Sequence, residues 1–395
     1  MNSNNVKNTR RNNKRSNNKR SNNKRTNKSK KRAKRRIYQK KNQLVNVLTS
    51  RFNKAVDQKL ITIGIVTAPY ISDKDTYITS YMAASYVKWM ESAGALVIPL
   101  QFDLPKPVLL GLLKQLNGIV LIGGGINNAQ THKHEQFMVY QETMQYILNY
   151  VNSQNNVGNY YPIWCICMSF ELAAIFKATG NILKKQKNVG YHLIKDGKYG
   201  DGTIQWSNSP SKIKNIFTRK EIQEMNKAAT VYYAHSYAIK HDSHLASELQ
   251  KLAHITATSK SEENVRYVAM FEMKNQPIYG VQFHPEKVPF EYVNDGLRIP
   301  KTDIAIKFST KLARFFINEC KKNSNIWIGG KRLFDFTIND YNIFNKATTK
   351  RLRNLEKDNI HTSQMGDAGT YLFGPTVVPI NSNIIANPWD AVNEN

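Results

Sequence analysis

One short run constrains the fold of this chain more than any other. Between Tyr161 and Glu171, an apolar, strand-like stretch stops abruptly at Cys167, and a helix-like stretch begins at the next residue. A sharp strand-to-helix turn of this kind, a nucleophile elbow, presents one reactive side chain at the end of a sheet strand. The run therefore predicts an α/β fold in which the Cys167 thiol is offered for chemistry.

A second run supplies the groups that a thiol nucleophile requires. In Tyr279-Gly-Val-Gln-Phe-His284-Pro-Glu286, a strand-like stretch is followed by a histidine and a carboxylate. A thiol with a pKa of about 8.5 is mostly protonated at neutral pH, so a base must remove its proton. His284 is the candidate base, and it can return the proton to a departing amine. Glu286 is the candidate carboxylate that orients the imidazole. The two runs together predict a cysteine hydrolase.

Negative charge that develops on a substrate needs hydrogen-bond donors. The amide of Met168, at the start of the helix-like stretch, points toward an oxyanion formed at Cys167, and the helix dipole adds to its effect. A second donor is expected from the strand-like run that starts at Gly118 and ends in a glycine turn at residues 123–125. Glycines let the backbone approach a substrate closely. The two segments predict an oxyanion hole.

Strand-like and helix-like runs alternate along the first half of the chain. We expect strands at residues 61–67, 96–100 and 119–122, and helices at 77–92, 108–116, 135–151 and from the elbow to about 177, closed by Gly180. Such alternation is typical of a central, mostly parallel sheet with helices on both faces. Ligands bind these sheets at the carboxyl ends of the strands, where the elbow and the glycine turn meet.

Shorter runs follow the elbow helix. Strand-like stretches at residues 230–233, 266–273 and 278–283 predict an antiparallel portion before a helix over about 302–320. Residues 181–228 are rich in Lys, Asn and Gly. We expect them to form loops that border the substrate cleft.

Four segments, taken in order, resemble the gamma-glutamyl hydrolase (folylpolyglutamate hydrolase) family of the class I glutamine amidotransferase-like superfamily. They are Tyr81–Gly94, the glycine turn, Trp164–Glu171 and Gly280–Tyr292, and the similarity spans roughly residues 60–322. The resemblance implies a flavodoxin-like fold. It also implies a cysteine hydrolase that cleaves gamma-glutamyl bonds, above all those of folylpoly-gamma-glutamates, through a thioester at Cys167. No metal and no organic cofactor is implied.

The same resemblance assigns roles to individual residues. It implies that Cys167 is the nucleophile, that His284 is the general base and acid, and that Glu286 is the partner of that histidine. It implies an oxyanion hole at Gly124 and Met168. The residues that it places near the bound gamma-glutamyl group are Glu171 and His235.

The elbow departs from the family pattern, which is Gly-x-Cys-x-Gly. Here the flanking residues are Cys165 and Ser169. Strand and helix pass close together at these positions, so the side chains there are normally small. The Cys165 thiol is either accommodated by a slight shift of the chain, or it tilts Cys167 away from His284 and lowers activity.

Two other functions remain open. One is a glutaminase-type amidotransferase, which normally needs a synthase domain or partner to receive ammonia, and no such domain is evident in the sequence. The other is a catalytically impaired member of the fold that acts as a binding protein on nucleic acid or a particle. The altered elbow keeps this second alternative open.

The net charge of +28 is concentrated at the N-terminus. Residues 1–41 contain eighteen Lys and Arg and no acidic residue, and the motif Asn-Asn-Lys-Arg-Ser recurs there. Such a segment lacks the apolar side chains needed for a core, so we expect residues 1–55 to be a basic, low-complexity, disordered tail. It can bind nucleic acid or another polyanion nonspecifically, or act as a nuclear or particle address.

The rest of the chain is expected to hold a catalytic domain at residues 56–325 and a C-terminal extension at 326–395, where Gly-Pro and Asn-Pro breakers occur. No apolar run approaches the ~18 residues that a membrane span needs. Three cysteines imply no disulfide framework. The N-terminus lacks the apolar core of a signal peptide. We therefore expect an intracellular protein with no membrane span.

Overall fold

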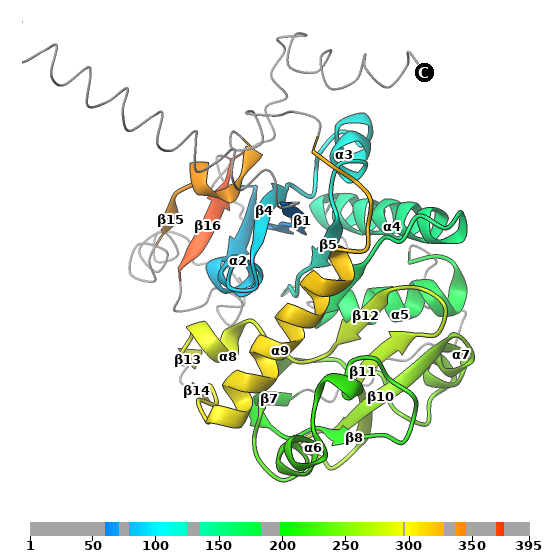
Figure 1. Ribbon diagram of the computed structural model, residues 1–395, viewed down its shortest axis with the longest axis vertical. Helices are drawn as coiled ribbons and strands as arrows, with labels where there is room; N and C mark the ends of the chain where they lie inside the picture. The colour runs from blue at the N-terminus through cyan, green and yellow to red at the C-terminus, as the bar shows by residue number, and fades with distance from the viewer. Residues whose placement is uncertain are drawn as a thin grey trace, which may run out of the picture. The chain divides into compact units, whose positions relative to one another are not determined.

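Figure 1 shows the computed structural model of the chain. It describes residues 60–70, 79–124, 135–182, 198–294, 297–327, 336–344 and 369–374. The basic tail expected at residues 1–55 lies outside these ranges, as does Gly125. The described elements belong to the compact unit Ile61–Asn395.

The main sheet has eight strands, in the order β4-β1-β5-β6-β12-β11-β10-β8. Their bounds are β1 (Ile61–Val66), β4 (Ala95–Leu100), β5 (Gly118–Leu121), β6 (Ile163–Ile166), β8 (Gln205–Trp206), β10 (Ala253–Lys260), β11 (Arg266–Met273) and β12 (Ile278–Val281). The first five strands of that order are parallel and the last three are antiparallel. In chain order the parallel strands follow the 2-1-3-4-5 arrangement of flavodoxin-like sheets. The predicted fold class is confirmed.

Helices cover both faces of this sheet, as expected for strands that are apolar along their whole length. Their bounds are α2 (Ala84–Glu91), α3 (Lys106–Leu113), α4 (Glu135–Asn156), α5 (Met168–Thr179) and α9 (Asp303–Cys320). Helices α2 and α9 lie on one face, while α4 and α5 lie on the other (Figure 1). Trp164 of β6 packs against Trp89 of α2 and Phe316 of α9, with ring centroids 5.9 and 5.8 Å apart. No helix in the described part of the chain is both long and apolar enough to cross a membrane.

The prediction of loops at residues 181–228 is wrong within the described part, 198–228. Strand β7 (Lys198–Gly202), strand β8 and helix α6 (Arg219–Met225) lie there. Helix α6 begins with a capping box in which Thr218 and Glu221 satisfy each other's backbone amides. Glu221 also pairs with two lysines of α9. The sequence Thr218-Arg-Lys-Glu221 carries the signal for this helix.

The strand expected at residues 230–233 is present as β9 (Val231–His235), but it pairs with β7 in a separate two-stranded sheet. The short helix α8 (Lys287–Phe290) contacts β9, and the hairpin of β13 (Val293–Asn294) and β14 (Leu297–Arg298) contacts β7. Helix α7 (His244–Leu252) follows β9 in the chain and packs against α5 and β10. The backbone amide of His284 donates to the carbonyl of Tyr232 in β9, 2.8 Å away. Strand β9 is thereby tied to the segment that follows β12.

A second sheet joins the start of the fold to its C-terminal part. Its order is β15-β16-β3-β2, with β2 (Ala68–Pro69), β3 (Ser80–Ala83), β15 (Ile343–Phe344) and β16 (Thr370–Phe373). The helix expected at 77–92 therefore begins only at Ala84. Residues 80–83 pair with β2 on one side and with β16 on the other, and this pairing overrides their helical pattern. Strand β16 holds the segment that leads directly into α2.

Candidate active site

Cys167 stands at the turn between β6 and α5, where strand gives way to helix. Its φ is 56° and its ψ is −114°. A non-glycine residue with positive φ is strained and is held only by its surroundings. The Cys167 amide donates to the Val281 carbonyl at 2.8 Å, and the Cys167 carbonyl accepts from the Glu171 amide at 3.1 Å. The elbow expected from the sequence is therefore present, with Cys167 at its strained position.

His284 and Glu286 form a fully buried pair. Nδ1 of His284 donates to Oε1 of Glu286 at 2.7 Å, and neither side chain is exposed. This bond fixes the proton on Nδ1 and leaves Nε2 as the acceptor. Nε2 has no hydrogen-bond partner among the described residues. The imidazole is therefore oriented as a general base must be.

The glycine turn brings Cys167 and His284 to one point. A Cβ placed on Gly123 would lie 2.9 Å from Cε1 of His284, 3.1 Å from Cβ of Cys167 and 3.2 Å from the hydroxyl of Tyr86. No side chain fits there, so only glycine allows the three groups to converge. The carboxyl ends of β5, β6 and β12 thus meet as the sequence motifs predict.

Tyr86 is a site residue that the sequence analysis does not single out. Its hydroxyl accepts a hydrogen bond from the Gly123 amide at 3.1 Å and lies 3.4 Å from Nδ1 of His284. The Gly123 amide is therefore occupied, which leaves the buried Gly124 as the described residue of the turn that could serve an oxyanion. The segment 81–94 carries the family resemblance, but a tyrosine in an amphipathic run gives no signal of its own.

The surroundings of Cys167 favour the neutral thiol over the thiolate. Burial raises the pKa of this thiol well above its ordinary value, and negative charge on Glu171, when that carboxyl is ionised, and on Glu286 raises it further. The amide of Met168, the first residue of α5, acts in the opposite direction by favouring the thiolate. The Sγ atom donates to the carbonyl of Ala234, 3.6 Å away. A base is therefore needed at the moment of attack.

This charge state has a measurable consequence. We expect alkylation of Cys167 by iodoacetamide to be slow at pH 7 and to rise about tenfold per pH unit without levelling off below about pH 9. The sign follows from the raised pKa, because less thiolate is present at each pH than for a free cysteine. The same measurement on the Cys167→Ala variant gives the rate of alkylation at Cys165 and Cys320, which are buried. This background rate is subtracted from that of wild type. A plateau reached between pH 6 and 7 would show a thiolate–imidazolium pair instead.

Glu171 and His235 both lie at the same site and are buried. Oε1 of Glu171 accepts from Nε2 of Gln282 at 3.0 Å, and burial raises the pKa of the carboxyl to about 8. Nδ1 of His235 donates to the Tyr237 carbonyl at 2.8 Å. Burial, with His284 nearby, lowers the pKa of His235 to about 3. At neutral pH, Glu171 is thus mainly protonated and His235 is neutral.

Ser169 has a role in the elbow that the sequence analysis misses. Its hydroxyl accepts from the Ile166 amide at 2.9 Å and donates to the Leu121 carbonyl at 2.6 Å. It therefore bridges β6 to β5 at the edge where Cys167 and the glycine turn follow. A glycine at position 169 would leave both backbone groups without this bridge.

We expect Ser169→Ala to lower kcat roughly tenfold, because reacting groups that shift by about an ångström lose much of their rate. The buried amide and carbonyl left without the hydroxyl cost about 1–3 kcal/mol each, so the unfolding temperature falls as well. Steady-state kinetics and thermal unfolding measure the two effects. Ser169→Thr keeps the hydroxyl and serves as the control. An alanine variant with unchanged kcat would contradict the bridging role.

Cys165 is accommodated within β6. It is fully buried and lies in register with Leu121 of β5 and with Gly280 of β12. The space beside Gly280 is filled by the rings of Phe170 and Phe271. Cys165, Cys167 and Cys320 are all free thiols. Within the ranges that the structure describes, no three His, Cys, Asp or Glu side chains are grouped as a metal site requires.

Comparison with known proteins finds one family model and several relatives. The family model described as "Glutamine amidotransferase class-I" matches residues 80–298. Gamma-glutamyl hydrolase 1 of Arabidopsis thaliana is 30% identical, over 67% of this chain and 72% of that protein. Gamma-glutamyl hydrolase of Bos taurus is 28% identical, over 62% of this chain and 72% of its own. Gamma-glutamyl hydrolase B of Dictyostelium discoideum is 28% identical, over 71% of this chain and 78% of that protein.

Proposed function

Because this chain belongs to the class-I glutamine amidotransferase family, and within it to the gamma-glutamyl hydrolases, we propose that it cleaves gamma-glutamyl amide bonds through a thioester at Cys167. Poly-gamma-glutamyl folates are the proposed substrates. The observation that supports the mechanism best is the buried His284–Glu286 pair, which meets the strained Cys167 beside Gly123. The remaining residues of the candidate site fit hydrolysis through a thioester, as the two steps below describe.

In the first step, Nε2 of His284 removes the thiol proton and Sγ of Cys167 attacks the gamma-carbonyl carbon. The carbonyl oxygen becomes an oxyanion, for which the amides of Met168 and Gly124 are the proposed donors. Glu286 stabilises the imidazolium through Nδ1. Collapse of the intermediate breaks the C–N bond, and His284 gives its proton to the departing amine.

In the second step, water replaces the amine. His284 takes a proton from the water, whose oxygen attacks the thioester carbon, and the Cys167 thiol leaves with that proton. The products are a free gamma-carboxyl group and the restored thiol. Protonated Glu171 can donate a hydrogen bond to a substrate carboxylate, and Nε2 of His235 can accept one from an amide. Both residues are therefore proposed to hold the gamma-glutamyl group.

Hydrolysis of a purified poly-gamma-glutamyl folate, followed by chromatography of the shortened folates and released glutamate, tests this proposal. An alpha-linked polyglutamate of equal length is the matched control, and free glutamine is the third substrate. Cleavage of the gamma-linked chain alone supports the proposal. Turnover of glutamine alone would favour the glutaminase alternative. No turnover of any substrate would favour a binding protein whose elbow has been disabled by Cys165 or Ser169.

We also propose that residues 1–41 bind nucleic acid or another polyanion, and that the protein acts inside the cell with this tail as a nuclear or particle address. Eighteen Lys and Arg with no acidic residue support a salt-sensitive, sequence-independent attraction. Deleting residues 1–41 is expected to abolish binding to single-stranded RNA in 50 mM salt and to leave folate turnover unchanged. Filter binding and the hydrolysis assay measure the two effects. RNA binding that survives the deletion would refute a role for the tail.

A further inference from the structure

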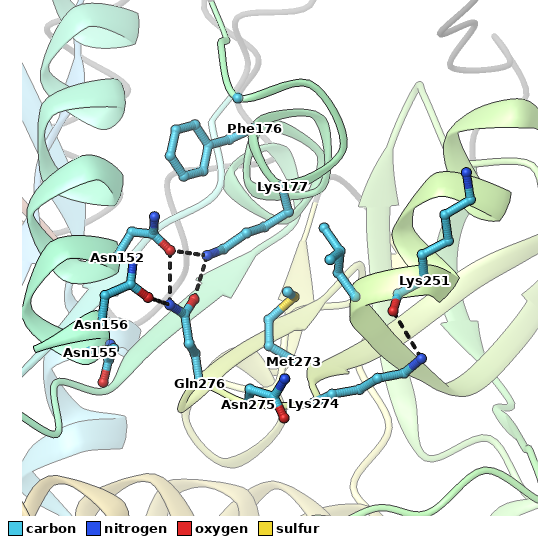
Figure 2. A pocket seen from close by; sticks show the side chains of 12 residues that line it. Asn152, Asn155, Asn156, Phe176, Lys177, Lys251, Met273, Lys274, Asn275 and Gln276 are labelled. Carbon is cyan, nitrogen blue, oxygen red and sulfur yellow. Dashed lines mark hydrogen bonds between the residues drawn. The ribbon is translucent and has the colours of Figure 1, made fainter. Parts of the chain in front are cut away.

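A polar pocket lies at the end of the sheet opposite Cys167. It is formed where α4, α5 and α7 end, together with the turn between β11 and β12, and its volume is about 420 Å³. Figure 2 shows its side chains. Lys177 lies nine residues after Met168 in α5, which is about 14 Å along the helix axis at 1.5 Å per residue. The pocket is therefore separate from the candidate active site.

All the charged residues in the lining of this pocket are lysines. It includes Lys177, Lys251 and Lys274, and none of its residues is Asp or Glu. Lys251 pairs with Glu248, which lies outside the lining, and Lys274 donates to the carbonyls of residues 250 and 251 at the end of α7. Two of the three lysines thus have partners at the rim.

Lys177 is different, because it is half-buried whereas Lys251 and Lys274 are exposed, and its ammonium group bonds only to neutral oxygens. Nζ donates to Oδ1 of Asn152 at 2.9 Å and to Oε1 of Gln276 at 2.6 Å. In the described part of the chain, no carboxylate lies within ion-pair distance of it. Burial lowers its pKa from 10.5 to about 8. A half-buried ammonium group without a counter-charge gains stability from a nearby anion.

The ammonium group of Lys177 is also held in place. Nε2 of Gln276 donates to Oδ1 of Asn152 and Oδ1 of Asn156, each at 2.9 Å, while its Oε1 accepts from Lys177. The dashed lines in Figure 2 trace this network, which ties α4, α5 and the β11–β12 turn together. The amide groups of Asn152 and Asn156 have protons that bond to no described residue. They add neutral donors around the charged one.

The volume exceeds what a single inorganic ion needs, and part of the wall is apolar. Phe176, Leu252 and Met273 supply that part. A ligand that fits has one oxyanion head for Lys177 and the amides, and a small hydrocarbon body for the apolar wall. We propose that this pocket is a second binding site, for a small organic molecule that carries a carboxylate or phosphate group.

Isothermal titration of the full chain with phenyl phosphate and with benzoate, in 150 mM salt, tests the proposal. The basic tail also attracts anions, so the readout is the difference between wild type and Lys177→Met. We expect saturable binding of at least one probe, weakened at least tenfold in Lys177→Met and retained in Lys177→Arg. Binding of phenyl phosphate alone identifies phosphates as the class, and binding of benzoate alone identifies carboxylates. Uncharged benzamide should not bind.

The matched control is Lys260→Met, which removes one exposed lysine from the far end of β10. It should bind the probe within twofold of wild type, and so should Cys167→Ala, whose change lies at the other site. Circular dichroism checks that each variant is folded. If Lys177→Met does not fold, Lys274→Met provides a second test. The proposal would be overturned if wild type showed no saturable binding, or if Lys177→Met bound the probe as tightly as wild type. It would also be overturned if Lys260→Met lost as much affinity as Lys177→Met.

Discussion

Cys167→Ala is expected to lower hydrolysis of gamma-glutamyl substrates by at least about 10⁴-fold, because no other group can form the thioester. The change removes one buried sulfur and relieves little of the surrounding packing. The fold should therefore survive, and substrate should still bind with a similar KM or Kd. Initial rates of folate shortening, measured with the variant at high enzyme concentration, give the size of the loss.

Cys165→Ala is the matched control for this variant. Cys165 is also buried and lies two residues away, but it stands in the strand before the elbow and contributes no reacting atom. Its removal should leave kcat within about threefold of wild type. If Cys167→Ala retained activity, or if the two variants lost it equally, the nucleophile would have to be sought elsewhere.

His284→Ala is expected to lower kcat by about 10³- to 10⁴-fold, because the neutral thiol of Cys167 then has no base. The residual rate should rise with pH above 8, since hydroxide in solution must replace the imidazole in removing a proton whose pKa is raised. Glu286→Gln should lower kcat by a smaller factor than His284→Ala does, at least about 10²-fold, because it keeps the imidazole but disturbs its tautomer. The pH profile of kcat for the three proteins measures these differences.

His254→Ala is the control for general effects of losing a histidine. His254 lies on β10, outside the site, so its removal should leave the profile unchanged. A His284→Ala variant with the same kcat as wild type at pH 7 would remove His284 from the mechanism. A residual rate that did not depend on pH would mean that the thiol of Cys167 is already ionised.

The sequence predicts the parallel part of the fold well, because its strands are apolar runs bounded by glycines and helices. Ile61–Val66 and Gly118–Leu121 are examples. It fails where pairing between distant segments decides the structure. Residues 80–83 have a helical pattern and form a strand, because Thr370–Phe373 pairs with them. No local sequence feature of either segment predicts this pairing.

The candidate site also contains some residues that local sequence patterns predict and others that they do not. Cys167, His284 and Glu286 can be found in the sequence because the elbow and the histidine motif are local patterns, and the sheet then brings them together. Tyr86 and Ser169 cannot, because each acts through hydrogen bonds to backbone atoms that are distant in the sequence. A tyrosine on a helix and a serine after a cysteine are too common to predict such contacts. The capping box of α6 is a local signal that the sequence did carry.

The position of β16 affects how the protein is made. Strand β3 leaves the ribosome well before its partner β16 is synthesised. At 5–20 residues per second, the roughly 290 residues between them take about 15–60 s to translate. During that time the edge of β3 that will bind β16 is open to other nascent chains. The segment that leads into α2 and Tyr86 therefore reaches its final form only after β16 has been synthesised, and until then it is a natural client for chaperones.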